Sequence, residues 1–126
     1  MEMTVTDSLR ELAYAQAAAF VQTLNGRDPV ALQRDWGLSP AVAAEIVDML
    51  DSYFAANEAL SLTPLAHAFV PGKGGRPGVD VYATGDGPLG LECLLLADGK
   101  PGEAILHLEM SGHDGALRLH YRYIGS

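Results

Sequence analysis

The second half of the chain alternates between apolar and polar residues, and this alternation constrains the fold more than any other feature of the sequence. The turn sequences GDGP, ADGKPG and SGHDG separate the runs. A period of two residues is typical of strands with one buried face, and turns this short join antiparallel neighbours. The sequence therefore predicts an antiparallel meander of four to five strands, at about 65–70, 79–84, 89–96, 103–110 and 116–124.

The first half has a helical period instead, because its apolar residues recur at three- and four-residue spacing. Ser8 followed by Glu11 fits a capping box, and Gly26 lies where a left-handed residue is expected to end a helix. The Asp-Pro and Ser-Pro pairs at 28–29 and 39–40 are signals for a helix start. We expect helices at about 9–25, 29–36 and 40–56, packed on one face of the sheet in an α+β fold.

Matching the apolar faces of the strands gives an expected register. A tight turn at His113-Asp114 pairs Leu108 with Leu119 and Leu106 with Tyr121. The apolar face of the last strand would then carry Leu117, Leu119, Tyr121 and Tyr123, with Glu109 opposite Arg118 on the other face. A turn that pairs Leu96 with Glu103 extends this register to the strand before.

This register places Glu92, His107 and His120 in one row across three strands. Neighbouring side chains on a sheet face lie about 5 Å apart, so two imidazoles and a carboxylate could share a divalent ion such as zinc. A solvated sheet face also carries residues of these types, and this second interpretation is the favoured one. We therefore predict no metal site and no cofactor, and keep the row as the alternative.

Composition restricts the class of protein. The chain has 126 residues, 48% of them hydrophobic and 19% charged, which is typical of a single globular domain spanning 1–126. The net charge of −8 disfavours nucleic acid and anionic membrane surfaces, because both bind cationic proteins. The single cysteine, Cys93, favours a reducing compartment. With no signal peptide or membrane-spanning segment indicated, we expect a cytoplasmic protein.

The negative charge is concentrated in the first half. Residues 1–60 hold nine acidic and three basic residues, for a net charge of −6, and no lysine or arginine lies between Asp35 and Gly72. Clustered carboxylates steer a basic partner, although acidity can also serve solubility alone. The predicted partner-binding residues are Glu45, Asp48, Asp51 and Glu58.

The element order resembles the nuclear-transport-factor-2-like, or cystatin-like, superfamily. The resemblance is carried by helices that end near DSYFAANEAL, residues 51–60, followed by strands across 79–124. It implies a curved antiparallel sheet that wraps helices and often encloses a pocket. Members include dehydratases, isomerases, small-molecule binders and protein-binding modules, among them some immunity proteins. The resemblance carries over no catalytic residue.

Two functions of different classes remain open. The favoured one is a non-catalytic acidic protein-binding module, such as an immunity or antitoxin-type protein that neutralises a basic effector. The alternative is a small pocketed ligand binder or dehydratase-like or isomerase-like enzyme, with His67 or Tyr53 as its acid or base. Two copies could also pair through the outward sheet face, which is expected to carry Leu94, Leu96, Ile105 and Ile124.

Overall fold

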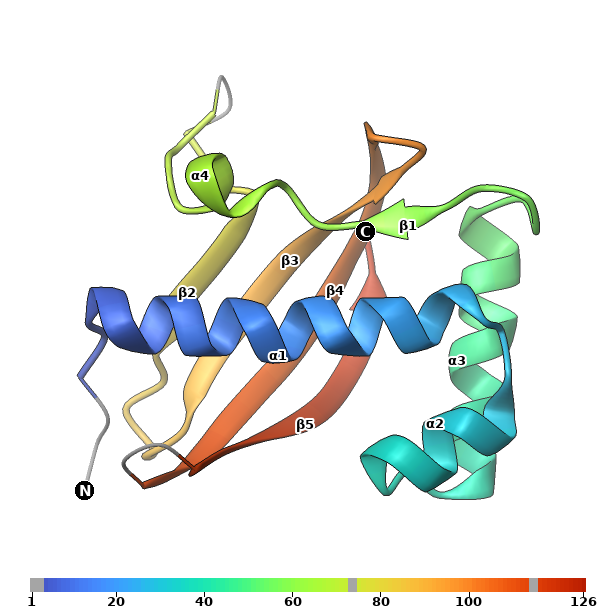
Figure 1. The fold of residues 1–126 in the computed structure, drawn as a ribbon, viewed down its shortest axis with the longest axis horizontal. Helices are drawn as coiled ribbons and strands as arrows, with labels where there is room; N and C mark the ends of the chain where they lie inside the picture. Colours follow the sequence, from blue (N-terminus) through green and yellow to red (C-terminus); the bar gives the residue numbers. More distant parts are fainter. Residues whose placement is uncertain (1–3, 73–74, 114–115) are drawn as a thin grey trace.

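The computed structural model describes residues 4–72, 75–113 and 116–126. Three helices come first, α1 (Asp7–Asn25), α2 (Pro29–Trp36) and α3 (Pro40–Tyr53). The remaining elements are β1 (Leu60–Ser61), the one-turn helix α4 (Leu65–Ala68), β2 (Val79–Ala83), β3 (Leu89–Ala97), β4 (Lys100–His113) and β5 (Ala116–Gly125). The predicted α+β class, with helices before an antiparallel sheet, is confirmed (Figure 1).

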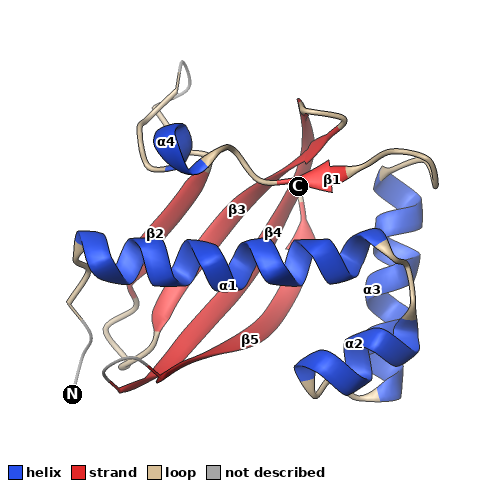
Figure 2. Ribbon diagram, in the orientation of Figure 1, coloured by secondary structure: helices blue, strands red, loops and turns tan. Residues whose placement is uncertain are grey.

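The sheet is built around β3. One edge of β3 pairs with β4, which in turn pairs with β5. The other edge is shared, because β2 pairs with residues 89–93 and the short β1 pairs with residues 96–97. All four pairings are antiparallel, and the strands form one twisted layer (Figure 2).

One face of this sheet is covered by α1, which runs across the strands (Figure 1). The helices α2 and α3 pack together, and α3 also contacts β5. Phe20 on α1 meets Trp36 edge to face at 5.1 Å, and its side chain is fully buried. Burying a side chain of this size contributes about 1.5–3 kcal/mol to stability. The largest fully buried side chains include Phe20, Leu24, Leu32, Ile46, Leu50, Leu91, Leu106 and Met110.

Local capping explains where the helices begin and end. The predicted starts of α2 and α3 are confirmed, with the side chains of Asp28 and Ser39 accepting backbone hydrogen bonds from residues in the first turn. The predicted start of α1 at Ser8 is wrong, because Thr6 is the N-cap and accepts from the Leu9 nitrogen at 3.1 Å. Val5 and Leu9 both pack on the core, which holds this earlier start in place.

Two ends of helices also differ from expectation. Gly26 has a right-handed φ of −73°, and the left-handed residue is its neighbour Arg27, with φ of 50°. The helix α3 ends at Tyr53 rather than at residue 56, because Phe54 turns into an extended conformation that buries its ring to 7% exposure.

The segment predicted as a strand at 65–70 is instead the helix α4. Only Ala68 is fully buried, and Phe69 after it packs edge to face against Tyr14 at 6.3 Å. The exposed Leu65, Ala66 and His67 precede them, so burial does not alternate along the segment. A short apolar run fits a helical turn as well as a strand, and here the start after Pro64 and the inward position of Ala68 favour the turn.

The register of β4 and β5 differs from the predicted one in two ways: residues 116–121 of β5 are shifted by two positions, so that Leu108 lies opposite Tyr121 and not Leu119, and a β-bulge follows. Leu108 pairs with Tyr121 and His107 with Tyr123, so Arg122 is the additional residue of β5. Beyond the bulge, the residues of β5 face the side of the sheet opposite to the one that alternation predicts. Ile124 is therefore buried, opposite Leu106. The expected inward position of Tyr123 and outward position of Ile124 are therefore both wrong. Residues 114–115 of the predicted turn lie outside the described residues.

The predicted register of β3 and β4 is confirmed over most of its length. Glu92 pairs with His107 and Leu94 with Ile105, as the apolar alternation requires. Near the turn, a register shift after Leu94 pairs Leu96 with Pro101 instead of Glu103.

Candidate functional site

The exposed side of α3 carries three of the four predicted partner-binding residues. Glu45, Asp48 and Asp51 follow one another at three-residue spacing, which places them along one stripe of the helix. The opposite side of α3 faces the core through Ala43, Ile46 and Leu50, each fully buried. We call the stripe of Glu45, Asp48 and Asp51 the acidic face of α3.

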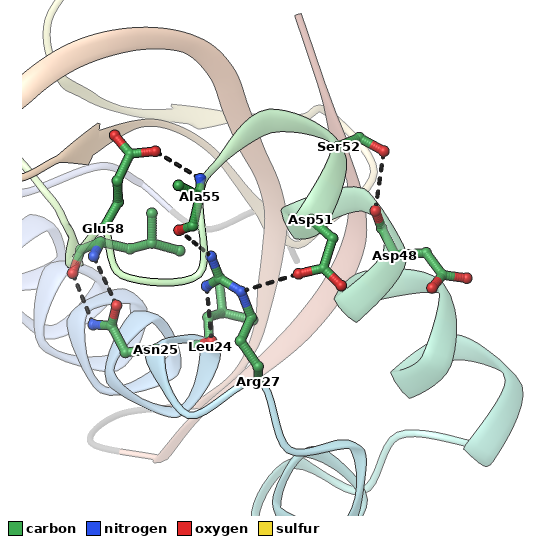
Figure 3. Close-up of polar contacts among 9 residues, drawn as sticks. Leu24, Asn25, Arg27, Asp48, Asp51, Ser52, Ala55 and Glu58 are labelled. Carbon is green, nitrogen blue, oxygen red and sulfur yellow. Dashed lines mark hydrogen bonds and ion pairs between the residues drawn. The ribbon is translucent and has the colours of Figure 1, made fainter.

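Asp51 has a cation beside it. Its Oδ1 lies 3.6 Å from Nε of Arg27, a pair that joins the end of α3 to the turn after α1 (Figure 3). The Arg27 guanidinium also donates long hydrogen bonds to the carbonyl oxygens of Leu24 and Ala55, at 3.4 and 3.5 Å. The Asp51 side chain is 59% exposed, so solvent screens the pair, and its contribution to stability is small. Arg27 thus neutralises one end of the acidic face.

Glu58 does not belong to the acidic face. Its Oε1 accepts a hydrogen bond of 2.7 Å from the backbone nitrogen of Ala55 (Figure 3). Its own backbone nitrogen donates to the Ala55 carbonyl at 3.1 Å. These two bonds close the turn between α3 and β1. The structure therefore gives Glu58 a local role in the turn, away from the other three carboxylates.

Asn25 and Arg27 organise this region, and sequence reasoning did not identify them. The Asn25 amide makes two hydrogen bonds with Leu60, donating to its carbonyl at 2.8 Å and accepting from its nitrogen at 2.7 Å. The end of α1 is thereby fixed to β1 (Figure 3). The partners lie 35 residues apart in the chain, so a local sequence pattern could not have revealed them.

Glu45 and Asp48 are the uncompensated part of the acidic face. Within the described part of the chain, neither carboxylate has an ion pair or a side-chain hydrogen bond. The last turn of α3 also contains no basic residue. Burial, together with the nearby negative charge of Glu45, raises the pKa of Tyr121 on β5 to about 12. The stripe thus starts beside β5 and runs to the Arg27 contact.

A different row of side chains crosses the sheet on the face opposite α1. Asp80 pairs with Glu92, Glu92 with His107, and His107 with Tyr123. The rings of His107 and Tyr123 stack at 4.1 Å with 13° between their planes, and Nδ1 of His107 lies 4.0 Å from Oε1 of Glu92.

His120, the third member of the predicted metal row, lies elsewhere. The register of β4 and β5 is shifted by two residues from the predicted one, so His120 lies opposite Glu109, and its Nε2 shares a hydrogen bond of 2.8 Å with Ser111 Oγ. The structure brings Glu92 and His107 together but not His120. Among residues 4–72, 75–113 and 116–126, no group of three His, Cys, Asp or Glu side chains is arranged to hold a metal ion. Glu109 is paired with Arg122 at 3.7 Å instead of the expected Arg118.

The two predicted acid or base residues do not share a site. His67 on α4 is exposed and lines a groove on the sheet face opposite α1. Tyr53, at the end of α3, is partly buried against the core, with its ring 6.2 Å from that of Phe54. Cys93 is fully buried, and burial raises the pKa of its thiol to about 12, which disfavours the reactive thiolate at neutral pH.

The chain matches no protein-family model, no curated protein and no solved structure in the comparisons made. The resemblance to the nuclear-transport-factor-2-like superfamily therefore stays a prediction. Within the described residues, the helices are too short or too polar for any of them to cross a membrane.

Proposed function

We propose that this chain is a non-catalytic protein-binding module whose acidic face of α3 docks onto a basic protein surface. An immunity or antitoxin-type protein that neutralises a basic effector in the cytoplasm is the favoured form of this function. The observation that carries the proposal is the stripe of three exposed carboxylates on one helix, of which only Asp51 has a cation beside it among the residues that the structure describes.

The stripe is unfavourable for the isolated protein, and this supports a role in binding. Carboxylates three residues apart on a helix repel one another, by about 0.2–0.5 kcal/mol for each pair. Asp51 also lies in the last turn of α3, near the negative end of the helix dipole. Solubility alone would be served equally well by acids in the first turn, where the dipole stabilises them. A basic partner would relieve both effects.

The arrangement favours association with cations in two ways. Exposed charges of one sign raise the rate of encounter with an oppositely charged surface. Glu45 and Asp48 also have no internal ion pair to break among the described residues, so a partner can engage them without that cost. The face therefore centres on Glu45 and Asp48, with Asp51 at its edge and Glu58 outside it.

The test compares two double charge reversals that change the net charge equally. Glu45→Lys with Asp48→Lys inverts the acidic face, whereas Asp86→Lys with Glu103→Lys inverts two exposed acids of the strand half. Each protein is immobilised and exposed to lysate of the source organism at low and high salt, and the retained proteins are identified by mass spectrometry. Thermal melts check that both variants fold.

We expect a basic protein to be retained by the wild type and by the Asp86/Glu103 variant, and to be lost from the Glu45/Asp48 variant and at high salt. Equal retention by the Glu45/Asp48 variant would contradict the proposal. If both variants lose the basic protein equally, retention depends on net charge alone. This outcome would also contradict a specific role of the acidic face.

A further inference from the structure

A groove of about 520 Å³ lies on the sheet face opposite α1, and the acidic face of α3 takes no part in it. Leu91 and Cys93 point into the core. Glu92 and Leu94 alternate with them along β3 and therefore point to the groove side. Residues from 63–72 and 75–78, among them His67 and Arg76, form one wall. Small-molecule sites typically measure about 300–1,000 Å³, and the groove has the size of one.

The floor of the groove is apolar. Leu94 and Leu96 of β3 and Ile105 of β4 lie side by side there, and Leu94 pairs directly with Ile105. An apolar ligand body seated on these side chains would remove their exposed surface from water, which is favourable by about 25 cal/mol for each Å² buried. The floor supplies affinity but no preference for one ligand charge.

Charge preference comes from two carboxylates at one end of the floor. Asp80 and Glu92 are directly opposed on β2 and β3, and both line the groove. Like charges in this position destabilise a sheet. Arg76 compensates only one of them, with its Nη2 at 3.3 Å from Oε1 of Glu92. Within the described residues, the half-buried Asp80 carboxylate has no ion pair or hydrogen bond.

We propose that this groove binds a small amphipathic cation, with its amine or guanidinium at Asp80 and its apolar body on Leu94, Leu96 and Ile105. The cation would offset the repulsion between the opposed carboxylates of Asp80 and Glu92. It would also give Asp80 the ion-pair partner that it lacks among the described residues. The apolar body would cover the floor. Each part of the ligand therefore corresponds to a feature that the sheet leaves uncompensated.

An anionic ligand fits the same groove less well. Arg76 is the one described arginine or lysine that lines it, and its guanidinium is already paired with Glu92. An anion at Arg76 would have to compete with Glu92 and would lie near the Asp80 carboxylate. The formal charge of these three described side chains is negative, so together they favour a cation over an anion.

The probe is n-octylamine, which is protonated at neutral pH because its amine resembles that of lysine. Octanoate and 1-octanol have the same chain length with a negative and a neutral head group. Binding of each to the full chain is measured by isothermal titration calorimetry, and groove residues are followed by NMR chemical shifts. We expect saturable binding of octylamine with shifts at Leu94 and Ile105, weaker binding of octanol, and none of octanoate.

Two substitutions in the groove should act in opposite directions. Asp80→Asn should weaken octylamine binding about tenfold, because it removes a charge-assisted contact. Arg76→Gln should tighten binding, because it releases Glu92 and leaves two carboxylates for the amine. Asp86→Asn is the matched control, since Asp86 is exposed on the turn after β2 and lies outside the groove lining, and it should leave the affinity unchanged.

If the substitutions act only by disturbing the structure, Asp80→Asn and Arg76→Gln should both bind octylamine more weakly. This outcome would overturn the proposal. Octanoate or octanol binding as tightly as octylamine would overturn it too, as would the absence of saturable amine binding. If Asp80→Asn does not fold cooperatively, Arg76→Gln decides alone, and affinity that is unchanged or lower in that variant contradicts the proposal. The experiment is independent of the acidic face of α3.

Discussion

The two faces of the sheet consist of alternate residues of the same strands, but they are built in different ways. On the face that α1 covers, Leu91, Cys93 and Leu106 are completely buried. On the opposite face, Glu92 and His107 keep about a fifth of their side-chain surface exposed, and Tyr123 keeps half. The first face supplies the free energy of folding. The second can carry opposed carboxylates because the first compensates for their cost.

The largest expected effect tests this comparison on a single strand. Leu91→Ala should destabilise the protein by about 2–5 kcal/mol, because it leaves a cavity in a closely packed core. Leu94→Ala, the same change on the groove side, should cost about 1 kcal/mol, because its methyl groups contact water already. Urea denaturation of both variants measures the two values. Similar costs would show that the groove side is as tightly packed as the core, and the comparison would fail.

The buried thiol of Cys93 gives the covered face a pH dependence. Its pKa is raised from 9.0 to about 12, so above pH 9 the unfolded chain loses this proton while the folded chain keeps it. This contribution is unchanged below about pH 9 and falls with rising pH up to about 12, by at most about 1.4 kcal/mol for each pH unit.

Urea titrations at about pH 8 and 10 of wild type and Cys93→Ala isolate this effect. The tyrosines are the same in both proteins, so the variant should lose less stability between the two pH values. Equal losses would mean that the thiol is accessible to water in the folded state, and that this part of the covered face is less closed than the structure shows.

The pairing of β3 with β4 and two of the helix starts were the predictable parts of the fold. Alternation of apolar residues in β3 and β4 gave the pairing of Glu92 with His107, and the capping signals at Asp28 and Ser39 gave two helix starts, because each depends on residues close together in the chain. The bulge at Arg122 was missed, since Tyr123 and Ile124 are both apolar enough to occupy either face. Alternation alone could not distinguish the two registers.

The candidate sites depended on contacts that sequence patterns do not encode. The acidic stripe of α3 follows from helical spacing in the sequence. The ion pair of Arg27 with Asp51 and the hydrogen bond of Glu58 within the turn depend on contacts that only the folded structure shows. The groove needs α4 and the following segment to lie beside β3, and sequence reasoning assigned a strand there. His67 lines this groove, which lies on the other side of the sheet from the one expected, and its role as an acid or base stays a prediction.

Gly90 offers a sharper test of the groove side, where the Tyr82 ring lies over it. A Cβ on Gly90 would come within 2.4 Å of that ring, whereas Tyr82 is exposed enough to swing away. Gly90→Ala should therefore be nearly neutral, as lost ring contact offsets the gain from replacing glycine in a strand. In a Tyr82→Ala background the same change should stabilise by about 0.5–1 kcal/mol. A double-mutant cycle by thermal melts measures the difference. Additive effects would show that the ring does not cover Gly90.

The smallest expected effect extends the comparison to α3, which also has one covered and one open face. Asp48→Lys turns the repulsion with Glu45 into an attraction, which should stabilise the fold by about 0.4–1 kcal/mol. Asp51 adds little, because Arg27 already pairs with it. Asp86→Lys, in a turn without such neighbours, should change the melting temperature little. The same Asp48→Lys protein should bind a basic partner more weakly. A gain in stability together with a loss of binding is expected only if the stripe is maintained for a partner at the cost of the isolated fold. A loss of stability in the Asp48→Lys protein would instead show that Asp48 stabilises the helix. The open face of α3 would then contribute to folding, unlike the open face of the sheet.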